Sequence, residues 1–211
     1  MSNWIIFGVG FLAQLLFSGR LIFQWIVSEK NRKVIAPSIF WKLSLLAAFL
    51  LFVYGYLRDD FAIMLGQALT YYIYIRNLQL QGEWTKQPKF LQWFFWFFPT
   101  VLVVYAYTNN TYDLTNLFNN DTISLKLLVW GSIAQIIFTL RFVYQWMYSE
   151  KNKESSLPFG FWVLSLIGSI MILIYAVLRK DPVLFVGHVL GSIIYARNIV
   201  LLRKSIQHNQ L

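Results

Sequence analysis

Two pairs of polar side chains stand inside long apolar stretches of the sequence, and each pair contains an arginine. Arg20 is followed four residues later by Gln24, and Arg141 is followed at the same spacing by Gln145. Residues four apart lie on one face of a helix, so each pair presents a cation and an amide together. Within a membrane such groups usually face a cavity or a partner, and arginine offers a planar fork of donors that suits phosphate or carboxylate.

Two structural explanations compete with anion binding for these arginines. Arg20 lies seven positions before the end of its apolar stretch, so its long side chain can extend to the membrane interface. It can also form an ion pair with Glu29 or Glu150. The sequence leaves all three roles open.

Other repeated residues complete the candidate site. Arg76-Asn77 and Arg197-Asn198 end two further apolar stretches at what we expect to be the same side of the membrane, so that four arginines surround one cavity. The expected ligand-binding residues are Gln14, Arg20, Gln24, Trp25, Arg76, Asn77, Gln135, Arg141, Gln145, Trp146, Arg197 and Asn198. The residues expected to dock a partner or to act as a gate are Glu29, Lys30, Asn31, Glu150, Lys151 and Asn152, which we place in loops.

Residues for enzyme chemistry are few. The chain has two histidines, His188 and His208, no cysteine, and no pair of carboxylates inside an apolar stretch. No glycine-rich phosphate loop or metal-ligand spacing occurs, and no nucleophile has an evident base beside it. We therefore expect no catalytic residue, no bound metal, no cofactor and no enzymatic activity.

These polar pairs arise from an internal duplication. The stretch AQLLFSGRLIFQWIVSEKN, which begins at Ala13, reappears as AQIIFTLRFVYQWMYSEKN at Ala134, 121 positions later, with ten of nineteen residues identical. Over residues 10–80 and 131–201, 28 of 71 aligned pairs are identical without a gap. Such a repeat predicts two structurally equivalent units.

The two copies differ in charge at two positions. Val163 takes the place of Lys42, and His188 takes the place of Gln67. We expect Lys42 either to make the cavity asymmetric or to extend to the interface. His188 is expected to be a packed or hydrogen-bonded residue and not a proton carrier.

Composition indicates that both units lie in lipid. Hydrophobic residues make up 58% of the 211 residues and charged residues only 13%, which is far more apolar than a globular protein. Seven stretches are long enough to cross about 30 Å of hydrocarbon, and we expect them to be helices. They are Trp4–Val27, Ser38–Leu57, Phe61–Leu78, Phe90–Tyr107, Leu125–Tyr148, Phe159–Leu178 and Val183–Leu202. The first lacks a basic leader and a cleavage site, so we expect a membrane span and not a signal peptide.

Three spans in each copy, with one unmatched span between the copies, predict a 3+1+3 arrangement of parallel repeats. The expected fold is an all-α polytopic membrane protein with repeats at residues 1–80 and 122–211 and a linker with the fourth span at 81–121. Eleven Lys and Arg residues fall on one side and four on the other. By the positive-inside rule the N-terminus is outside and the C-terminus cytoplasmic, so the net charge of +9 reflects topology and not nucleic-acid binding.

All repeated residues of the first span fall on one face. Placed at 100° per residue, they occupy an arc of about 140°, and the rest of the wheel is interchangeable aliphatic surface. We expect the arc to face the helix bundle and the remainder to face lipid. The residues of the arc are Gly10, Ala13, Gln14, Phe17, Arg20, Gln24, Trp25 and Ser28. For Gly10, Ala13 and Gly66 we expect close helix packing.

The repeated pattern AQ…F…R…QW…SEKN, followed by P…FW.LS, Y..LR.D, G and Y.RN, resembles the lipid A biosynthesis N-terminal domain family, here present twice. The plan of two three-helix repeats joined by one helix is similar to that of PQ-loop and SWEET transporters, although the chain has no Pro-Gln dipeptide. The first resemblance implies a component of lipid A or envelope-glycolipid metabolism in the inner membrane of a Gram-negative bacterium. The family's name comes from its occurrence near lipid-A-disaccharide synthase, but we expect the soluble glycosyltransferase domain of that enzyme to be absent here.

Two functions are consistent with these features. In the first, the protein carries or flips an anionic glycolipid, or a sugar-linked polyprenyl phosphate, across the inner membrane while the arginines hold the phosphate. In the second, it is a non-transporting adaptor or accessory subunit for a lipid A glycosyltransferase. We expect membrane lipids as partners, no nucleic acid, and a monomer or a lipid-mediated dimer.

Overall fold

The computed structural model describes residues 3–32, 34–58, 60–108 and 124–208, and these ranges contain α-helices and no β-strand. The helices are α1 (Asn3–Asn31), α2 (Ser38–Leu57), α3 (Phe61–Leu80), α4 (Lys89–Thr108), α6 (Leu125–Asn152), α7 (Phe159–Leu178) and α8 (Pro182–His208). The expected all-α fold is confirmed. Residues 109–121 of the expected linker, and 122–123 after it, lie outside the described part of the chain.

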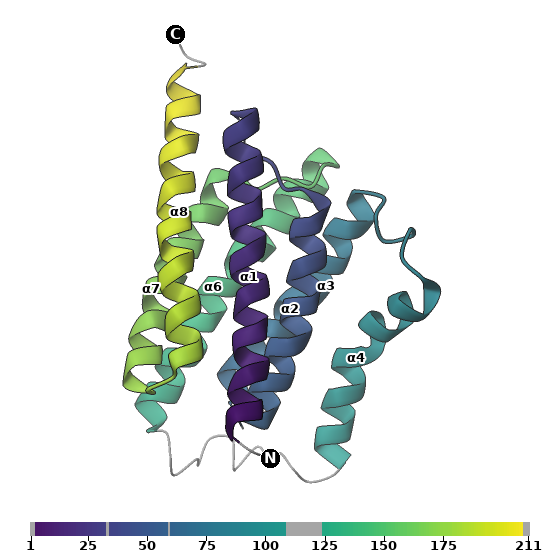
Figure 1. Cartoon of the computed structure of the whole chain (residues 1–211), viewed down its shortest axis with the longest axis vertical. Coiled ribbons are helices and arrows are strands. Elements are labelled where there is room, and N and C mark those ends of the chain that lie inside the picture. The colour runs from purple at the N-terminus through teal and green to yellow at the C-terminus, as the bar shows by residue number, and fades with distance from the viewer. Residues whose placement is uncertain (1–2, 33, 59, 109–123, 209–211) are drawn as a thin grey trace.

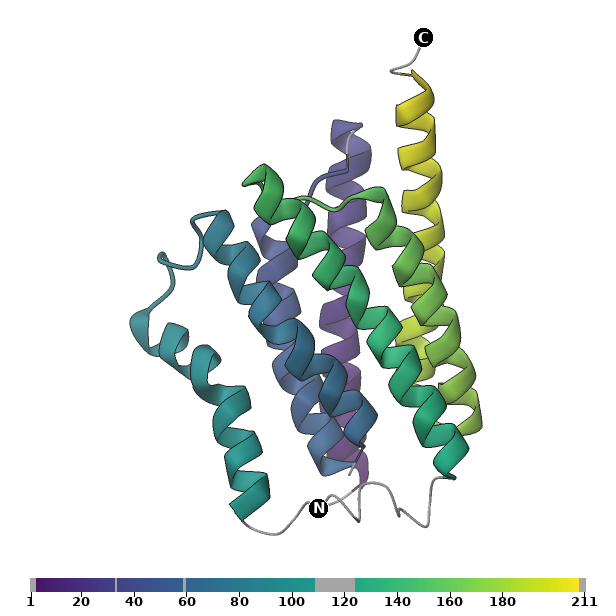
Figure 2. The ribbon, with the colours of Figure 1, turned by 180° about the vertical axis from the view of Figure 1, so that it is seen from behind.

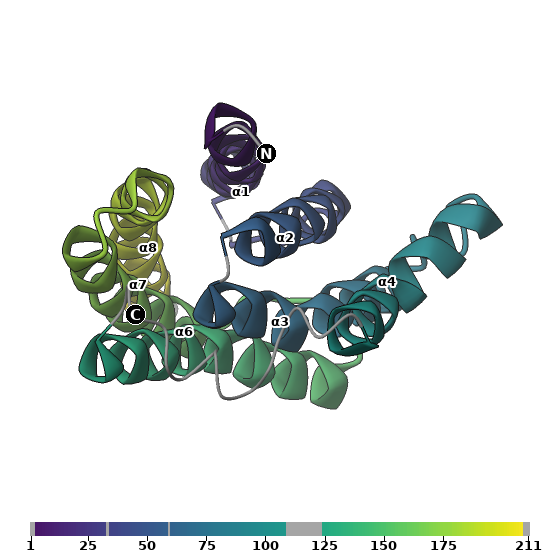
Figure 3. The ribbon, with the colours of Figure 1, turned by 90° about the horizontal axis from the view of Figure 1, so that it is seen from below.

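The six helices of the two repeats form a closed ring. Each packs against two neighbours in the order α1, α2, α3, α6, α7, α8 and back to α1, which Figure 3 shows from one end. α1 and α6 run in the same direction, as do α2 and α7, and α3 and α8, so the repeats are parallel (Figure 1). The repeats meet at two seams, one between α3 and α6 and the other between α1 and α8.

Proline residues precede α2 and α7. Pro37 and Pro158 are the N-cap residues in extended conformation, where the missing proline N–H leaves no helical hydrogen bond unmade. By contrast, α1 and α6 continue one turn beyond their expected ends. Residues 29–31 and 150–152, expected in loops, therefore belong to the last helical turns, because Glu and Lys are good helix formers.

Five of the described helices are long and apolar enough to cross a membrane, namely α1, α2, α6, α7 and α8. The expectation of membrane helices is confirmed for these five. α3 carries polar residues along its length, and Gln67, Thr70 and Asn77 are buried. These three buried polar residues thus lower the hydropathy of α3 without meeting the outer surface of the ring.

The repeated face of α1 turns inward. None of its eight residues is exposed, and Gly10, Ala13, Gln14, Arg20, Gln24 and Ser28 are buried. Large apolar side chains on the opposite face, such as Leu15 and Ile26, are exposed, which suits contact with lipid chains. The periodicity of the duplicated residues therefore located the inner face of this helix correctly.

α4 stands outside the ring, beside α3 (Figure 2). Phe94, Phe95 and Phe98 pack against Phe49 of α2, with ring centroids 5.5, 6.3 and 4.5 Å apart. Offset and edge contacts of this kind stabilise aromatic clusters beyond their area burial. α4 is thus held by its aromatic face and takes no part in the walls of the ring.

Candidate functional site

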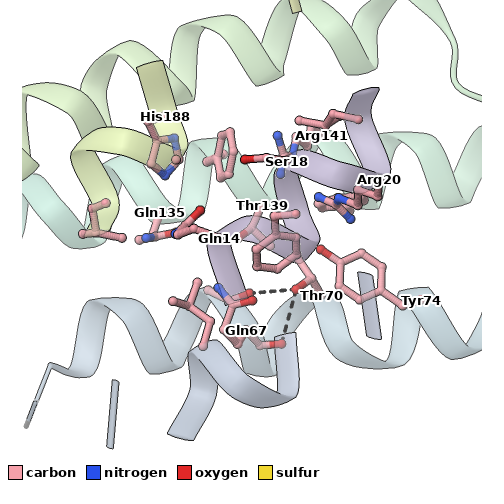
Figure 4. A pocket seen from close by; sticks show the side chains of 18 of the residues that line it. Gln14, Ser18, Arg20, Gln67, Thr70, Tyr74, Gln135, Thr139, Arg141 and His188 are labelled. Carbon is pink, nitrogen blue, oxygen red and sulfur yellow. Dashed lines mark hydrogen bonds between the residues drawn. The ribbon is translucent and has the colours of Figure 1, made fainter. Parts of the chain in front are cut away.

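A cavity of about 50 Å³ lies inside the ring, between the two repeats. Space of this size holds only a few water molecules. Most of its lining residues come from α1, α3, α6 and α8 (Figure 4). Many of them form repeat-related pairs 121 positions apart: Gln14 and Gln135, Ser18 and Thr139, Arg20 and Arg141, Gln67 and His188, and Tyr74 and Tyr195.

Arg20 is enclosed by aromatic rings and is only 2% exposed. Its Nη1 donates a hydrogen bond to Ser44 Oγ, and its Cζ lies 4.5 and 4.7 Å from the ring centroids of Phe17 and Phe40. Such cation–π contacts stabilise a desolvated guanidinium in part. Its Nε is buried without a hydrogen-bond partner. Burial rules out the explanation that Arg20 extends to the interface.

Arg141 has the equivalent place in the second repeat. Its Nη1 donates to Tyr195 Oη at 3.1 Å, its Cζ lies 3.4 Å from the Phe138 ring centroid, and its Nε is also buried without a partner. The ring of Phe142 contacts both cations, with its centroid 4.5 Å from Arg141 Cζ and 5.7 Å from Arg20 Cζ. The two guanidinium groups therefore border one aromatic ring and one cavity.

Arg76 and Arg197 do not border this cavity, so the expected ring of four arginines is wrong. Arg76 Nε lies 2.5 Å from Glu150 Oε1, and Arg197 Nη2 lies 2.6 Å from Glu29 Oε1. These ion pairs join α3 to α6 and α8 to α1. They form because each arginine lies beside a glutamate on the last turn of the adjacent helix.

No Asp or Glu in the described part of the chain forms an ion pair with Arg20 or Arg141. The explanation that Arg20 pairs with Glu29 or Glu150 is therefore excluded. A buried ion costs far more than a buried neutral group unless it is paired, and the aromatic rings offset only part of this cost. The cavity is suited to an anion, which would balance the charge and meet both free Nε–H donors.

Gln14 and Gln135 enter the cavity over glycines of the opposite repeat. A Cβ at Gly187 would collide with Gln14 Oε1, and one at Gly66 would lie 2.6 Å from Gln135 Oε1. Only glycine leaves room for these amides. The expectation for Gly66 therefore needs correction, because an amide side chain, and not a neighbouring helix backbone, fills the space beside it.

His188 is a buried, hydrogen-bonded residue, as predicted. Its Nδ1 lies 3.0 Å from Ser169 Oγ, which donates to the His188 carbonyl at 3.2 Å and accepts from Ser192 Oγ at 3.0 Å. Lys42 forms an ion pair with Glu83 at 2.6 Å and does not line the cavity, so it does not make the cavity asymmetric.

The repeat-related amides behave differently in the two seams. Between α3 and α6, Gln145 Nε2 donates to Asn77 Oδ1 at 2.8 Å, and Asn77 Nδ2 donates to Gln145 Oε1 at 3.1 Å. Between α1 and α8, the equivalent oxygens Gln24 Oε1 and Asn198 Oδ1 are buried and have no partner. None of the four amides lines the central cavity.

Trp25 and Trp146, expected to bind ligand, also lie away from the cavity. Their Nε1 atoms donate to Glu29 Oε1 at 3.0 Å and to Glu150 Oε1 at 3.2 Å. They reinforce the same ends of α1 and α6 that carry the ion pairs. The expected docking residues that are exposed at these ends are Lys30, Asn31, Lys151 and Asn152.

The opposite end of the ring is closed by the Tyr, Arg and Asp residues of the repeated Y..LR.D motif, which the sequence alone did not mark as a site. Asp181 Oδ2 accepts a hydrogen bond from Tyr54 Oη at 3.1 Å and lies 3.7 Å from Arg58 Nη2. Its Oδ1 accepts from the backbone N–H groups of Val183 and Leu184, each at 3.0 Å. One buried carboxylate thus caps α8 and ties it to α2 of the other repeat.

The same cluster occurs in reverse. Asp60 Oδ2 accepts from Tyr175 Oη at 3.2 Å and from Arg179 Nε at 3.3 Å, while Oδ1 accepts from Ile63 N at 3.2 Å. The signal was present, since all three side-chain types recur 121 positions apart. The partners are not neighbours in the sequence, however, and only the ring order of the helices brings them together.

Three significantly similar proteins are named lipid-A-disaccharide synthase. That of Chlamydia felis is 26% identical over 209 residues, which are 95% of this chain and 33% of the relative. Those of Chlamydia pneumoniae and Chlamydia muridarum are 28% and 30% identical over 85% and 87% of this chain, and 30% and 32% of the relatives. The chain therefore spans about a third of the length of these relatives.

These names overturn two expectations. The expected transporter or flippase is wrong, because the relatives are named for a step in the synthesis of lipid A and not for transport. The expectation of no enzymatic activity is also wrong, because a synthase is an enzyme. A scarcity of nucleophiles and bases among these 211 residues does not bear on relatives with two thirds of their length outside the match.

The model of a family described as Lipid A Biosynthesis N-terminal domain matches residues 9–79 and 130–200. These two segments are the two repeats of the ring, α1 to α3 and α6 to α8. No solved structure is significantly similar to the chain, so the likeness to PQ-loop and SWEET proteins gains no support. Because the two matches cover more than half of the sequence, the chain belongs to the lipid A biosynthesis N-terminal domain family.

Proposed function

We propose that the chain serves in lipid A synthesis as a membrane-embedded unit that holds the anionic headgroup of a lipid A precursor between its two repeats. One observation carries the proposal: Arg20 and Arg141 are buried on the same cavity, and neither has a carboxylate partner in the described part of the chain. Family membership supports the pathway, and the arginines support the class of ligand.

A phosphate group suits these donors. Arg20 and Arg141 each offer a free Nε–H, and a charge-assisted hydrogen bond contributes roughly 1.5–3 kcal/mol. Gln14 and Gln135 add neutral amides to the same cavity, which suit the hydroxyl and amide groups of a sugar. An uncharged lipid would leave both guanidinium charges without compensation, so the cavity favours an anionic headgroup.

The ring must open to admit such a headgroup. The cavity of about 50 Å³ is far smaller than the roughly 300–1,000 Å³ of ordinary ligand sites. Both ends of the ring are tied across the repeats, at one end by Asp60 and Asp181 and at the other by Glu29 and Glu150. The state described is therefore a closed form, and a ligand enters when helices part.

We further propose that all seven helices cross the cytoplasmic membrane of a bacterium in the 3+1+3 arrangement, as a monomer or a lipid-mediated dimer. α3 runs alongside α2 in the ring with its polar side chains inward, and α4 follows it in the opposite direction (Figure 2). Reporter fusions at Lys30, Lys86 and Lys151 should then report the cytoplasm, and a fusion at Asp60 the outside. The likeness to PQ-loop and SWEET proteins is one of helix order and carries no function.

An adaptor for a lipid A glycosyltransferase is the second candidate. It is favoured by the relatives themselves, in which the segment similar to this chain makes up about a third of a protein named lipid-A-disaccharide synthase. Lys30 and Lys151 are exposed at the ends of α1 and α6 and would contact such a partner. Glu29 and Glu150 are already bound by arginines, so their substitution tests the seams and not docking.

One experiment distinguishes the two candidate functions, headgroup binding and the adaptor role. The protein is purified from a bacterium that makes lipid A, and bound lipids and proteins are identified by mass spectrometry. We expect a phosphorylated glycolipid on the wild type, its loss from Arg20→Gln and Arg141→Gln, and its retention by Lys30→Ala and Lys151→Ala. Retention of lipid by the arginine variants, with loss of a co-purified synthase from the lysine variants, would instead establish the adaptor.

A further inference from the structure

Two buried amide oxygens in the α1–α8 seam lack a hydrogen-bond donor, whereas their repeat-related counterparts in the α3–α6 seam have one. Gln24 and Asn198 are 0% exposed, yet Gln24 Oε1 and Asn198 Oδ1 have no partner. Gln145 and Asn77, at the equivalent positions, donate to each other's oxygens at 2.8 and 3.1 Å. Two interfaces built from the same residue types therefore differ in whether their buried amide oxygens accept a hydrogen bond.

A sequence difference between the repeats strengthens this asymmetry. Ser155 Oγ donates to Asn77 Oδ1 at 2.8 Å, and Gln145 Nε2 also donates to the Ser156 carbonyl at 3.0 Å. The first repeat has Val34 in place of Ser155, and valine has no hydroxyl to donate. Parting α3 from α6 therefore breaks bonds between buried amides and a serine, whereas parting α1 from α8 exposes acceptors that gain donors.

We infer that a lipid headgroup with hydroxyl or amide donors enters the ring through the α1–α8 seam and donates hydrogen bonds to Gln24 and Asn198. Its phosphate then lies at Arg20 and Arg141, so the inference rests on the proposed function of that cavity. Gln24 is one helical turn from Arg20, a rise of about 6 Å, which matches the reach of one sugar phosphate. The seam thus selects for neutral donors beside the anionic group.

The selectivity has a physical basis. A site with buried acceptors rejects an analogue without the matching donor, because the acceptors then stay unpaired. A lipid phosphate without hydroxyl or amide groups accepts hydrogen bonds from the arginines. It leaves the oxygens of Gln24 and Asn198 without a hydrogen-bond donor. Full affinity therefore requires a phosphate that accepts from the arginines and hydroxyl or amide groups that donate to the two oxygens, and a phosphorylated sugar carries both.

The internal duplication and two matched lipids supply the test. The full chain is placed in nanodiscs and labelled with photoactivatable phosphatidylglycerol or phosphatidylmethanol, which share one phosphodiester charge and differ in the hydroxyl donors. We expect the wild type to prefer phosphatidylglycerol about fivefold, as for one hydrogen bond, with labelled peptides from α1 and α8. Gln24→Met and Asn198→Leu should abolish the preference and change the melting temperature little, because each removes an unpartnered oxygen together with one hydrogen bond inside its own helix, from Gln24 Nε2 to Ser28 Oγ or from Asn198 Nδ2 to the Ile194 carbonyl.

The equivalent changes in the other seam are the controls. Asn77→Leu and Gln145→Met should lower the melting temperature, because they break existing bonds, and should keep the preference for phosphatidylglycerol in the folded protein. Equal labelling by both lipids in the wild type, or labelled peptides from α3 and α6, overturns the inference. If that labelling still depends on Arg20, the proposed function stands, whereas labelling by both lipids that Arg20→Gln leaves unchanged overturns both.

Discussion

The ring holds one half-buried and one buried pair of arginines in opposite circumstances. At one end, Arg58 and Arg179 each face an aspartate of the other repeat, and at the centre Arg20 and Arg141 face aromatic rings and no described carboxylate. All four recur at the same repeat spacing, so duplication alone does not distinguish them. The difference lies in the partner: an arginine paired within the chain fixes the fold, and one left unpaired is available to a ligand.

The largest effect is expected at the paired end. Asp181→Ala removes the cap of α8 and leaves the Tyr54 hydroxyl and the Arg58 charge without their partner. Breaking a buried pair from one side costs about 3–5 kcal/mol, so thermal unfolding in detergent should shift strongly to lower temperature. Tyr54→Phe, which removes one hydrogen bond, should cost only about 1 kcal/mol. A melting temperature unchanged by Asp181→Ala would contradict the structural role.

Substitution of the central arginines, Arg20 and Arg141, should instead lower ligand affinity and leave stability almost unchanged. Arg20→Ala and Arg141→Ala each remove a cation that has no carboxylate partner, so stability should change little, whereas affinity for an anionic glycolipid should fall roughly tenfold to a hundredfold. Arg20→Lys should restore only part of the affinity, because the charge returns without the planar fork. Lipid titration and thermal unfolding on the same samples give both quantities. Normal affinity in both alanine variants would remove the cavity from the proposed function.

A glycine beside the cavity provides an intermediate effect. Gly187→Ala places a methyl group against Gln14 Oε1, and because the end of this flexible side chain can shift, the cost should lie at the lower end of the usual overpacking range, about 1 kcal/mol. Gly19→Ala is the matched control, because nothing lies within 4 Å of its added Cβ and alanine favours a helix. Melting temperatures should fall for the first and hold or rise for the second. Gln14→Ala should relieve the clash in the double variant, and failure to do so would mean that Gly187 has another role.

The sequence predicts the helices of this fold better than the contacts between residues of different helices. The duplication and its 3.6-residue periodicity place the helices and bring Arg20 to the inner face, because these signals are local. The partners of Arg76 and of Tyr54 lie 74 and 127 residues away, so they depend on the order of helices in the ring, which periodicity does not encode. Lys42 shows the same limit, since its partner Glu83 becomes apparent only once α3 has folded back beside α2.

The smallest effect is expected where an ion pair lies at the surface. Lys42 and Lys86 donate to the Glu83 carboxylate at 2.6 and 2.7 Å and lower the pKa of Glu83 from 4.5 to about 2. Because the folded pKa is the lower one, the stabilisation is present above about pH 4.5 and is lost as the pH falls toward 2. Glu83→Gln should remove this part of the pH dependence of the melting temperature, with a small shift because solvent screens exposed pairs. Added salt should shrink the difference between the two proteins, and identical pH profiles at low salt would show that this pair, unlike the buried aspartates, contributes nothing to stability.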